Sequence, residues 1–71
     1  PVAKKQSDYD RGVIVGIALA CSPIQSGFDQ PTAVAEALDA AGLDRRKMKA
    51  AGVEEYDLKI LRPAFAQLRR R

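Results

Sequence analysis

The amino-acid sequence predicts a small all-α protein, a bundle of about four short helices in a single domain over residues 7–71. Three observations lead to this prediction. Apolar residues recur at three- and four-residue spacing, and glycines or prolines stand where helices of that period would end or begin. The chain has 71 residues, which is enough for only one small core. Residues 1–6 are mostly polar and are expected to form a flexible N-terminal tail.

The first helix is expected to run from Asp8 to Cys21. Ser7 is a good N-cap, and Asp10 stands in the first turn, where negative charge suits the helix dipole. The next nine residues are expected to form a loop, with Ile24 and Phe28 held against the core.

Two further helices are predicted around glycine stops. A helix over 32–41 begins behind a proline and is closed by Gly42. A short helix over 45–51 is capped by Asp44 and closed by Gly52. The residues around the two stops follow the same pattern, two alanines, a glycine, an apolar residue and an acid, which recurs after ten residues and is called the internal echo. The echo is either a repeated module or, as we favour because ten residues is short for a repeat, two similar helix–helix corners.

A fourth helical stretch starts near Glu54. Pro63 lies inside it, removes one backbone hydrogen bond and crowds the carbonyl of Lys59. This predicts either a kink in the C-terminal helix or a break, with a new helix beginning near Arg62.

Cysteine and histidine usage restricts the function classes. Cys21 is the only cysteine, so no intrachain disulfide can form, and a reducing, cytoplasmic location fits best. In its apolar helix, Cys21 is expected to be a core residue. The chain has no histidine, which removes imidazole bases and the usual zinc sites. We therefore expect no enzyme, no cofactor and no metal.

No segment is expected to cross a membrane. The longest apolar stretch, Gly12 to Cys21, has about half of the roughly 20 residues that a spanning helix needs. A membrane partner is therefore not expected.

The charges are divided unequally between the two parts of the chain. The first 43 residues carry three basic and five acidic residues, a net charge of −2. The last 28 carry nine basic and four acidic residues, a net charge of +5. A basic half on a small domain favours a polyanionic partner, of which double-stranded DNA is the leading candidate.

The segment from Thr32 to Ala51 resembles a helix-turn-helix, with Gly42 in the turn. Two features depart from that motif: Leu38 stands where a small residue is usual, and the second helix lacks the polar residues that commonly read bases. Its cations suit phosphates better. The C-terminal arginines, with Lys59 and Arg62, extend them into a basic stripe. The predicted nucleic-acid-binding residues are Arg45, Arg46, Lys47, Lys49, Arg69, Arg70 and Arg71.

The first helix is apolar nearly all round, which is typical of a helix that is covered on all sides. One interpretation is a homodimer interface formed by Val13, Gly16, Ile17 and Ala20. The other is a central core helix with glycines where a neighbour crosses. The sequence leaves both open.

Together these features predict a non-enzymatic helical protein that binds double-stranded nucleic acid in a regulatory or accessory role. Its size and compact helix–turn pattern are similar to those of small accessory proteins of bacteria and their phages, although no motif identifies a family. Binding of single strands by stacking is disfavoured, because two or three of the four aromatic residues are needed for the core.

The alternative function is a protein–protein interaction module, an adaptor or inhibitor that docks onto an acidic partner surface. An apolar patch on the first helix or around Ile24 and Phe28 would anchor it, with the cations as its rim.

Overall fold

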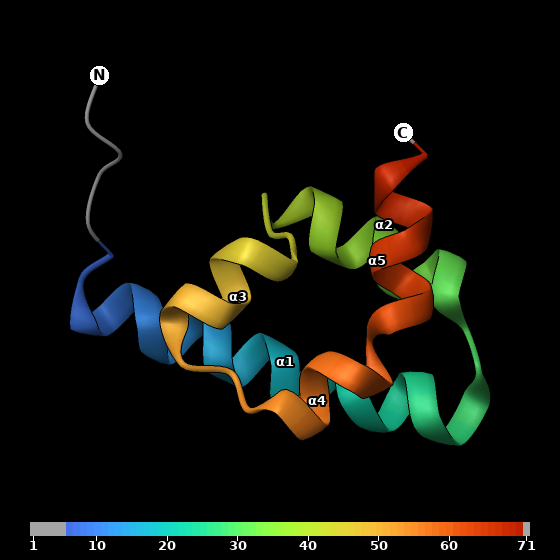
Figure 1. Cartoon of the computed structure of the whole chain (residues 1–71), viewed down its shortest axis with the longest axis horizontal. Helices are drawn as coiled ribbons and strands as arrows, with labels where there is room; N and C mark the ends of the chain where they lie inside the picture. Colours follow the sequence, from blue (N-terminus) through green and yellow to red (C-terminus); the bar gives the residue numbers. More distant parts are fainter. Residues whose placement is uncertain (1–5, 71) are drawn as a thin grey trace.

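The computed structural model describes residues 6–70, and over this range the chain forms five α-helices and no strand. The helices are α1 (Asp8–Phe28), α2 (Pro31–Ala40), α3 (Arg45–Ala51), α4 (Glu55–Ile60) and α5 (Arg62–Arg69). In Figure 1, α3 and α4 lie along α1, while α2 and α5 stand side by side. The predicted all-α class is confirmed.

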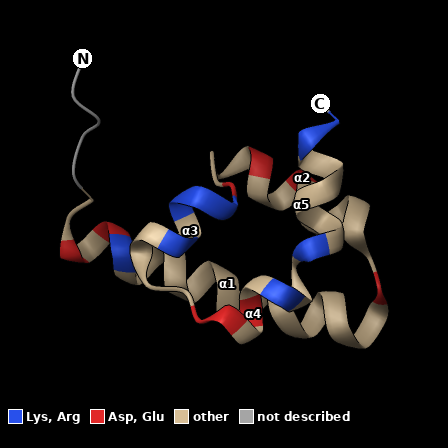
Figure 2. Cartoon of the chain, in the orientation of Figure 1, with Lys and Arg blue, Asp and Glu red and all other residues tan. Residues whose placement is uncertain are grey.

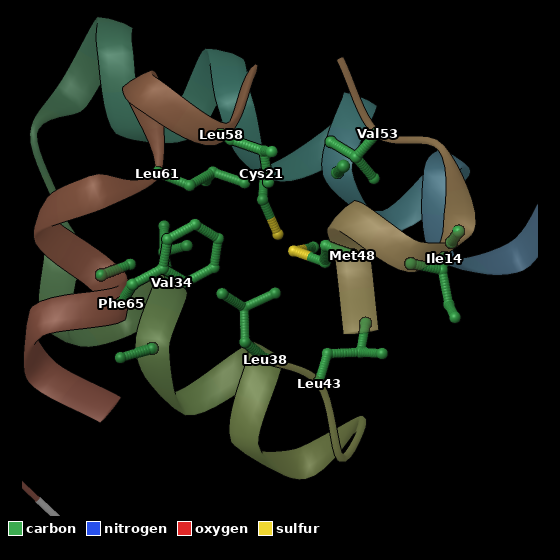
Figure 3. Close-up of a cluster of buried hydrophobic side chains, with 14 residues drawn as sticks. Ile14, Cys21, Val34, Leu38, Leu43, Met48, Val53, Leu58, Leu61 and Phe65 are labelled. Carbon is green, nitrogen blue, oxygen red and sulfur yellow. The ribbon is translucent and has the colours of Figure 1, made fainter. Parts of the chain in front are cut away.

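All five helices contribute to one hydrophobic core. Leu38 from α2, Met48 from α3 and Leu61 from the α4–α5 junction are its largest fully buried side chains. In Figure 3, the side chains of Leu38, Met48 and Cys21 point toward one another. Cys21 is confirmed as a core residue, and burial raises the pKa of its thiol. Because a thiol must ionise to react, Cys21 is a packing residue.

The start of α1 agrees with the prediction. The Asp10 backbone N–H donates to Ser7 Oγ at 3.1 Å, and the Ser7 N–H donates to Asp10 Oδ2 at 3.4 Å, which completes a capping box. The predicted flexible tail lies outside the described residues except for Gln6. The Gln6 side chain donates a hydrogen bond to the carbonyl oxygen of Lys47 at 3.2 Å.

The end of α1 corrects the prediction, because the helix continues from Cys21 through the expected loop to Phe28. Pro23 lies on the exposed side of the helix, as does Leu19, whose carbonyl loses its helical donor. Water can reach that carbonyl, so the lost hydrogen bond costs little. On the opposite side Ser22 and Gln25 are buried, so this part of the chain is packed as a helix. The Asp29 backbone N–H donates to the Gln25 carbonyl at 3.0 Å, and the Gln25 side-chain amide donates to Asp29 Oδ1 at 3.1 Å, which fastens the end of α1.

The longer helix also changes where two large side chains lie. Ile24 and Phe28 were expected to hold a loop against the core, but they are 44% and 73% exposed. Ile24 stands on a side of α1 turned away from the buried Ile14 and Ala18. Phe28 lies two turns after Cys21 on the same side, but it is the last residue of the helix and is left exposed there. The prediction of a pinned loop is therefore wrong.

The expectation that no segment could span a membrane is corrected as well. With 21 residues, α1 is long and apolar enough to cross one by length and composition. Core helices of soluble proteins and signal sequences have the same properties, so α1 assigns no location. Only 28% of its most apolar 18-residue window is buried in the structure. Much of α1 therefore faces outward.

The corner between α2 and α3 is a Schellman motif. Gly42 has φ of +70°, which L-residues with side chains rarely adopt, and the Leu43 N–H donates to the Leu38 carbonyl at 2.8 Å. Leu43 is buried beside this bond. The Asp44 carboxylate then accepts from the Lys47 backbone N–H at 2.9 Å and starts α3 at the predicted residue.

The corner between α3 and α4 repeats this geometry. Gly52 has φ of +97°, and the Val53 N–H donates to the Met48 carbonyl at 3.1 Å. Val53 is buried like Leu43. Glu54 begins the next helix without a side-chain cap. The internal echo in the sequence therefore corresponds to two similar corners.

The helix-turn-helix detail is not confirmed. In that motif the two helices pack on each other, whereas here α2 packs chiefly on α5 and α3 chiefly on α1. Leu38, which stands where the motif usually has a small residue, is fully buried in the core.

At Pro63 the chain breaks, as one of the two predicted alternatives had it. Helix α4 ends at Ile60, Leu61 forms the junction, and α5 begins at Arg62, so the described residues form five helices where about four were predicted. Pro63 stands in the first turn of α5, where its missing N–H has no helical partner to lose. The break turns α5 back toward α2, against which it packs.

Candidate nucleic-acid interface

Two adjoining hollows lie between the start of α3 and the α4–α5 segment, and together they are called the basic groove. A cleft of about 150 Å³ is lined by Arg45, Glu55, Leu58, Lys59, Arg62, Phe65 and Arg69. A neighbouring hollow of about 280 Å³ is lined by Asp44, Arg45, Arg46, Phe65, Leu68 and Arg69. Arg45, Phe65 and Arg69 line both hollows, so the two form one continuous surface.

The floor and one wall of the basic groove come from α5. Arg62, Phe65 and Arg69 follow one another at three- and four-residue spacing, which places them on the same side of the helix. Phe65 is only 3% exposed and forms the floor, while the two arginines remain exposed beside it. Arg45 is the first residue of α3 and stands opposite, held there by the Asp44 cap.

The groove has an excess of positive charge. Five cations line it against two carboxylates, those of Asp44 and Glu55. Arg45 Nη2 lies 3.7 Å from Glu55 Oε1, but the two side chains are 48% and 61% exposed. An ion pair this open to water contributes little, so Glu55 does not hold Arg45 away from an incoming anion.

The fold brings together three of the seven predicted nucleic-acid-binding residues. Arg45, Arg46 and Arg69 line the same hollow although Arg69 lies 23 residues or more from the other two in the chain. Lys59 and Arg62 join them. The sequence placed these two in the basic stripe but not among the predicted site residues. The sequence feature that could have identified Arg62 as a site residue is its spacing from Arg69. The two are seven residues, or two helical turns, apart and so share one side of a helix.

The other four predicted residues do not line the groove. The Lys47 ammonium donates to the Gly42 carbonyl at 2.8 Å and so points at the corner. Lys49 is exposed on α3, and Arg70 is exposed just after α5. Arg71 lies outside the described residues.

The aromatic residues are distributed differently from the expectation. Of the four, only Phe65 is buried, whereas Tyr9, Phe28 and Tyr56 are between 72% and 80% exposed. None of the three exposed rings lines the basic groove. The groove therefore offers no exposed ring on which a base could stack.

The predicted dimer-interface residues lie mostly on the outside of α1. Val13 is 44% exposed, Gly16 and Ala20 are exposed, and Ile17 is half-buried. A wider series shares their exposure at three- and four-residue spacing and is called the outer face of α1. It consists of Tyr9, Val13, Gly16, Ala20, Ile24 and Gly27.

The outward side of α3 and the outer face of α1 point away from each other. Met48 and Ala51 are the buried residues of α3, which packs chiefly on α1, so Arg46 and Lys49 face away from α1. The outer face of α1 lies on the opposite side of that helix from the core. Figure 2 shows basic residues on α3, α4 and α5 and none along the middle of α1.

Within residues 6–70, no group of three or more metal-ligating His, Cys, Asp or Glu side chains comes together. Comparison with known proteins gives no further assignment. No protein-family model matches the chain, and neither the curated proteins nor the solved structures include a significant match.

Proposed function

We propose that this protein binds double-stranded nucleic acid through the basic groove and catalyses no reaction. The observation that supports this most is the gathering of five cations from three helices around one groove. Guanidinium and ammonium groups at this density are suited to neighbouring phosphates of a backbone. The proposed role is regulatory or accessory.

Phosphate neutralisation would supply the binding free energy. Each phosphate that a cation neutralises releases condensed counterions, so affinity falls as salt rises, with a slope of about −0.9 per contact. Arg46 and Lys49 extend the contact along the outward side of α3. Because these residues are cations and lack amide or hydroxyl groups, the proposed binding depends little on sequence.

Fluorescence anisotropy with a random-sequence DNA duplex tests the proposal. The triple variant Arg45→Gln/Arg62→Gln/Arg69→Gln removes three groove cations. We expect its affinity at low salt to fall at least about tenfold and its salt slope to flatten by about two to three.

The matched control is Arg11→Gln/Lys47→Gln/Arg70→Gln, which removes the same charge from cations that do not line the groove. It should bind within about threefold of the wild type. Equal losses of affinity in both variants would mean that net charge alone attracts the duplex. If the wild type does not bind the duplex at low salt, the proposal is wrong.

The protein-interaction alternative has one supporting observation, the exposure of Ile24, Phe28 and the rest of the apolar surface of α1. In that alternative the apolar anchor and the basic rim belong to one docking surface. Here Ile24 stands on the outer face of α1, away from the cations on the outward side of α3, which favours the nucleic-acid proposal. Binding of the groove to polyglutamate but not to the duplex would reverse this preference.

A further inference from the structure

We propose that the outer face of α1 binds a second copy of this chain, with the two α1 helices antiparallel. This surface is separate from the basic groove, and the inference does not depend on nucleic-acid binding. It extends the predicted interface of Val13, Gly16, Ile17 and Ala20 to both ends of the helix.

The first support is the amount of apolar surface. Tyr9, Val13 and Ile24 on this face are between 44% and 80% exposed. Together they present on the order of 300 Å² per chain. A stable interface takes about 800 Å² from each partner. The large side chains of this face therefore supply part of the area that a dimer needs, and its smaller residues, with Leu19 and Phe28 on the two flanks of α1, supply the rest.

The second support is charge. No charged residue occurs between Arg11 and Asp29, which leaves 17 consecutive uncharged residues. An antiparallel partner would thus bury no ionised group in the middle of the contact, where an unpaired charge costs most. The terminal acids Asp8, Asp10 and Asp29 stay at the two ends, in water.

The third support is that the face fits itself. In an antiparallel pair centred on Ala18, residues equally distant from Ala18 lie opposite each other. Tyr9 then lies over the partner's Gly27, and Gly16 over the partner's Ala20. Val13 meets the partner's Ile24 in the same way, at nearly the same distance from the centre.

This pattern places Tyr9 against Gly27 at the ends, Val13 against Ile24 closer in, and small residues against each other at the centre, where the axes come closest. A Cβ built on Gly16 or Gly27 meets no atom within 4 Å, so the space above both is open. A twofold axis repeats each contact, which is the usual geometry of homodimers. A lipid surface would require no such matching of positions.

Sedimentation equilibrium on the full chain tests the inference. The wild type should have twice the 7.7 kDa of one chain at micromolar to millimolar concentration. Ala20→Glu places a charge at the centre of the face and should give the mass of a single chain with unchanged helical circular dichroism. The control Ala33→Glu changes an exposed alanine of α2 and should stay dimeric. Gly27→Glu provides a second disrupting variant, should Ala20→Glu alter the fold.

Orientation has its own test. A mixture of Val13→Cys chains and Ile24→Cys chains should form an intermolecular disulfide on mild oxidation, while neither variant alone should do so. The buried Cys21 is common to both and stays unreactive.

Three results would overturn the inference: a monomeric wild type, a dimer that Ala20→Glu and Gly27→Glu both leave intact, or crosslinking of Val13→Cys chains with one another. If the wild type is monomeric and co-floats with phosphatidylcholine–phosphatidylglycerol vesicles, and the Ala20→Glu variant does not, the face would be assigned to a lipid surface instead.

Discussion

The two glycine corners end their helices in the same way and begin the next helices differently. Both have a glycine with positive φ followed by a buried apolar residue, Leu43 or Val53. After the first corner, Asp44 caps α3 with its carboxylate, but Glu54 makes no side-chain cap to α4. The glycine and the apolar residue therefore set the change of direction, while the length of the acidic side chain decides whether the next helix is capped.

The difference matters for the basic groove. The capped corner holds the first turn of α3, which carries Arg45 and Arg46 into the groove. In this corner the Gly42 carbonyl also accepts a hydrogen bond from the Lys47 ammonium. The described residues of the uncapped corner make no corresponding hydrogen bond. The corner with the two additional side-chain hydrogen bonds is thus the one that carries cations of the proposed interface.

The largest expected effect comes from the apolar residues of the corners. Leu43→Ala should lower the free energy of unfolding by about 2–3 kcal/mol, because it leaves a cavity beside the Schellman bond. Val53→Ala should cost about 1–2 kcal/mol, since fewer buried carbons are removed. Urea denaturation measures both. As a control, Tyr56→Ala removes a side chain that is 72% exposed and should cost less than about 0.5 kcal/mol. A larger loss at Val53 than at Leu43 would contradict this order.

Next come the glycines themselves. Gly42→Ala and Gly52→Ala should each cost about 1–2 kcal/mol, because an added Cβ disfavours positive φ. No atom lies within 4 Å of either new Cβ, so the cost comes from backbone strain and not from a steric clash. Gly52, whose φ of +97° is farther from the left-handed helical region, should lose more. Thermal unfolding compares the two variants. Gly42→Asn should lower the free energy of unfolding less than Gly42→Ala does. Equal losses of stability would argue against backbone strain as the cause.

A smaller effect is expected from the cap of α3. Asp44→Ala should cost about 1 kcal/mol, while Asp44→Asn keeps a capping oxygen and should cost only a few tenths. Asp44→Asn also removes one of the two carboxylates of the basic groove. It should raise duplex affinity by about two- to threefold at low salt, where charges at the surface are least screened. Anisotropy titrations that find weaker binding for Asp44→Asn would place the nucleic acid elsewhere.

The smallest effect should be a gain. Glu54→Asp shortens the side chain so that it can cap α4 as Asp44 caps α3, and it should add about 0.5 kcal/mol to the stability. The reverse exchange, Asp44→Glu, should remove a similar amount from the first corner. Calorimetric melting of both variants decides whether side-chain length is the difference between the corners.

The sequence predicted these corners well because their signals are local. Ser7 and Asp44 as caps, and Gly42 and Gly52 as stops, act on backbone groups a few residues away, and α3 has its predicted bounds. The end of α1 was missed because the effect of Pro23 depends on which side of the helix faces the core. Ser22 and Gln25 on the other side of the helix are buried, which is a tertiary feature that no local pattern contains.

The candidate site was predictable only in part, for the same reason. The sequence identified Arg45, Arg46 and Arg69 from their charge, but their meeting depends on α5 turning at Leu61 to lie near the start of α3. The Lys47 ammonium donates to the Gly42 carbonyl and does not line the groove, and this contact depends on the shape of the corner, which the sequence does not show.

The opposed directions of the outward side of α3 and the outer face of α1 have a consequence for architecture. In many dimeric DNA-binding proteins, two recognition elements point the same way and grip successive turns of one duplex. A dimer formed through α1 would instead carry its cations on its two far sides, with both α1 helices sandwiched between them. Where both proposals hold, each basic groove would face a duplex of its own, and the paired α1 helices would act as the spacer between the two duplexes.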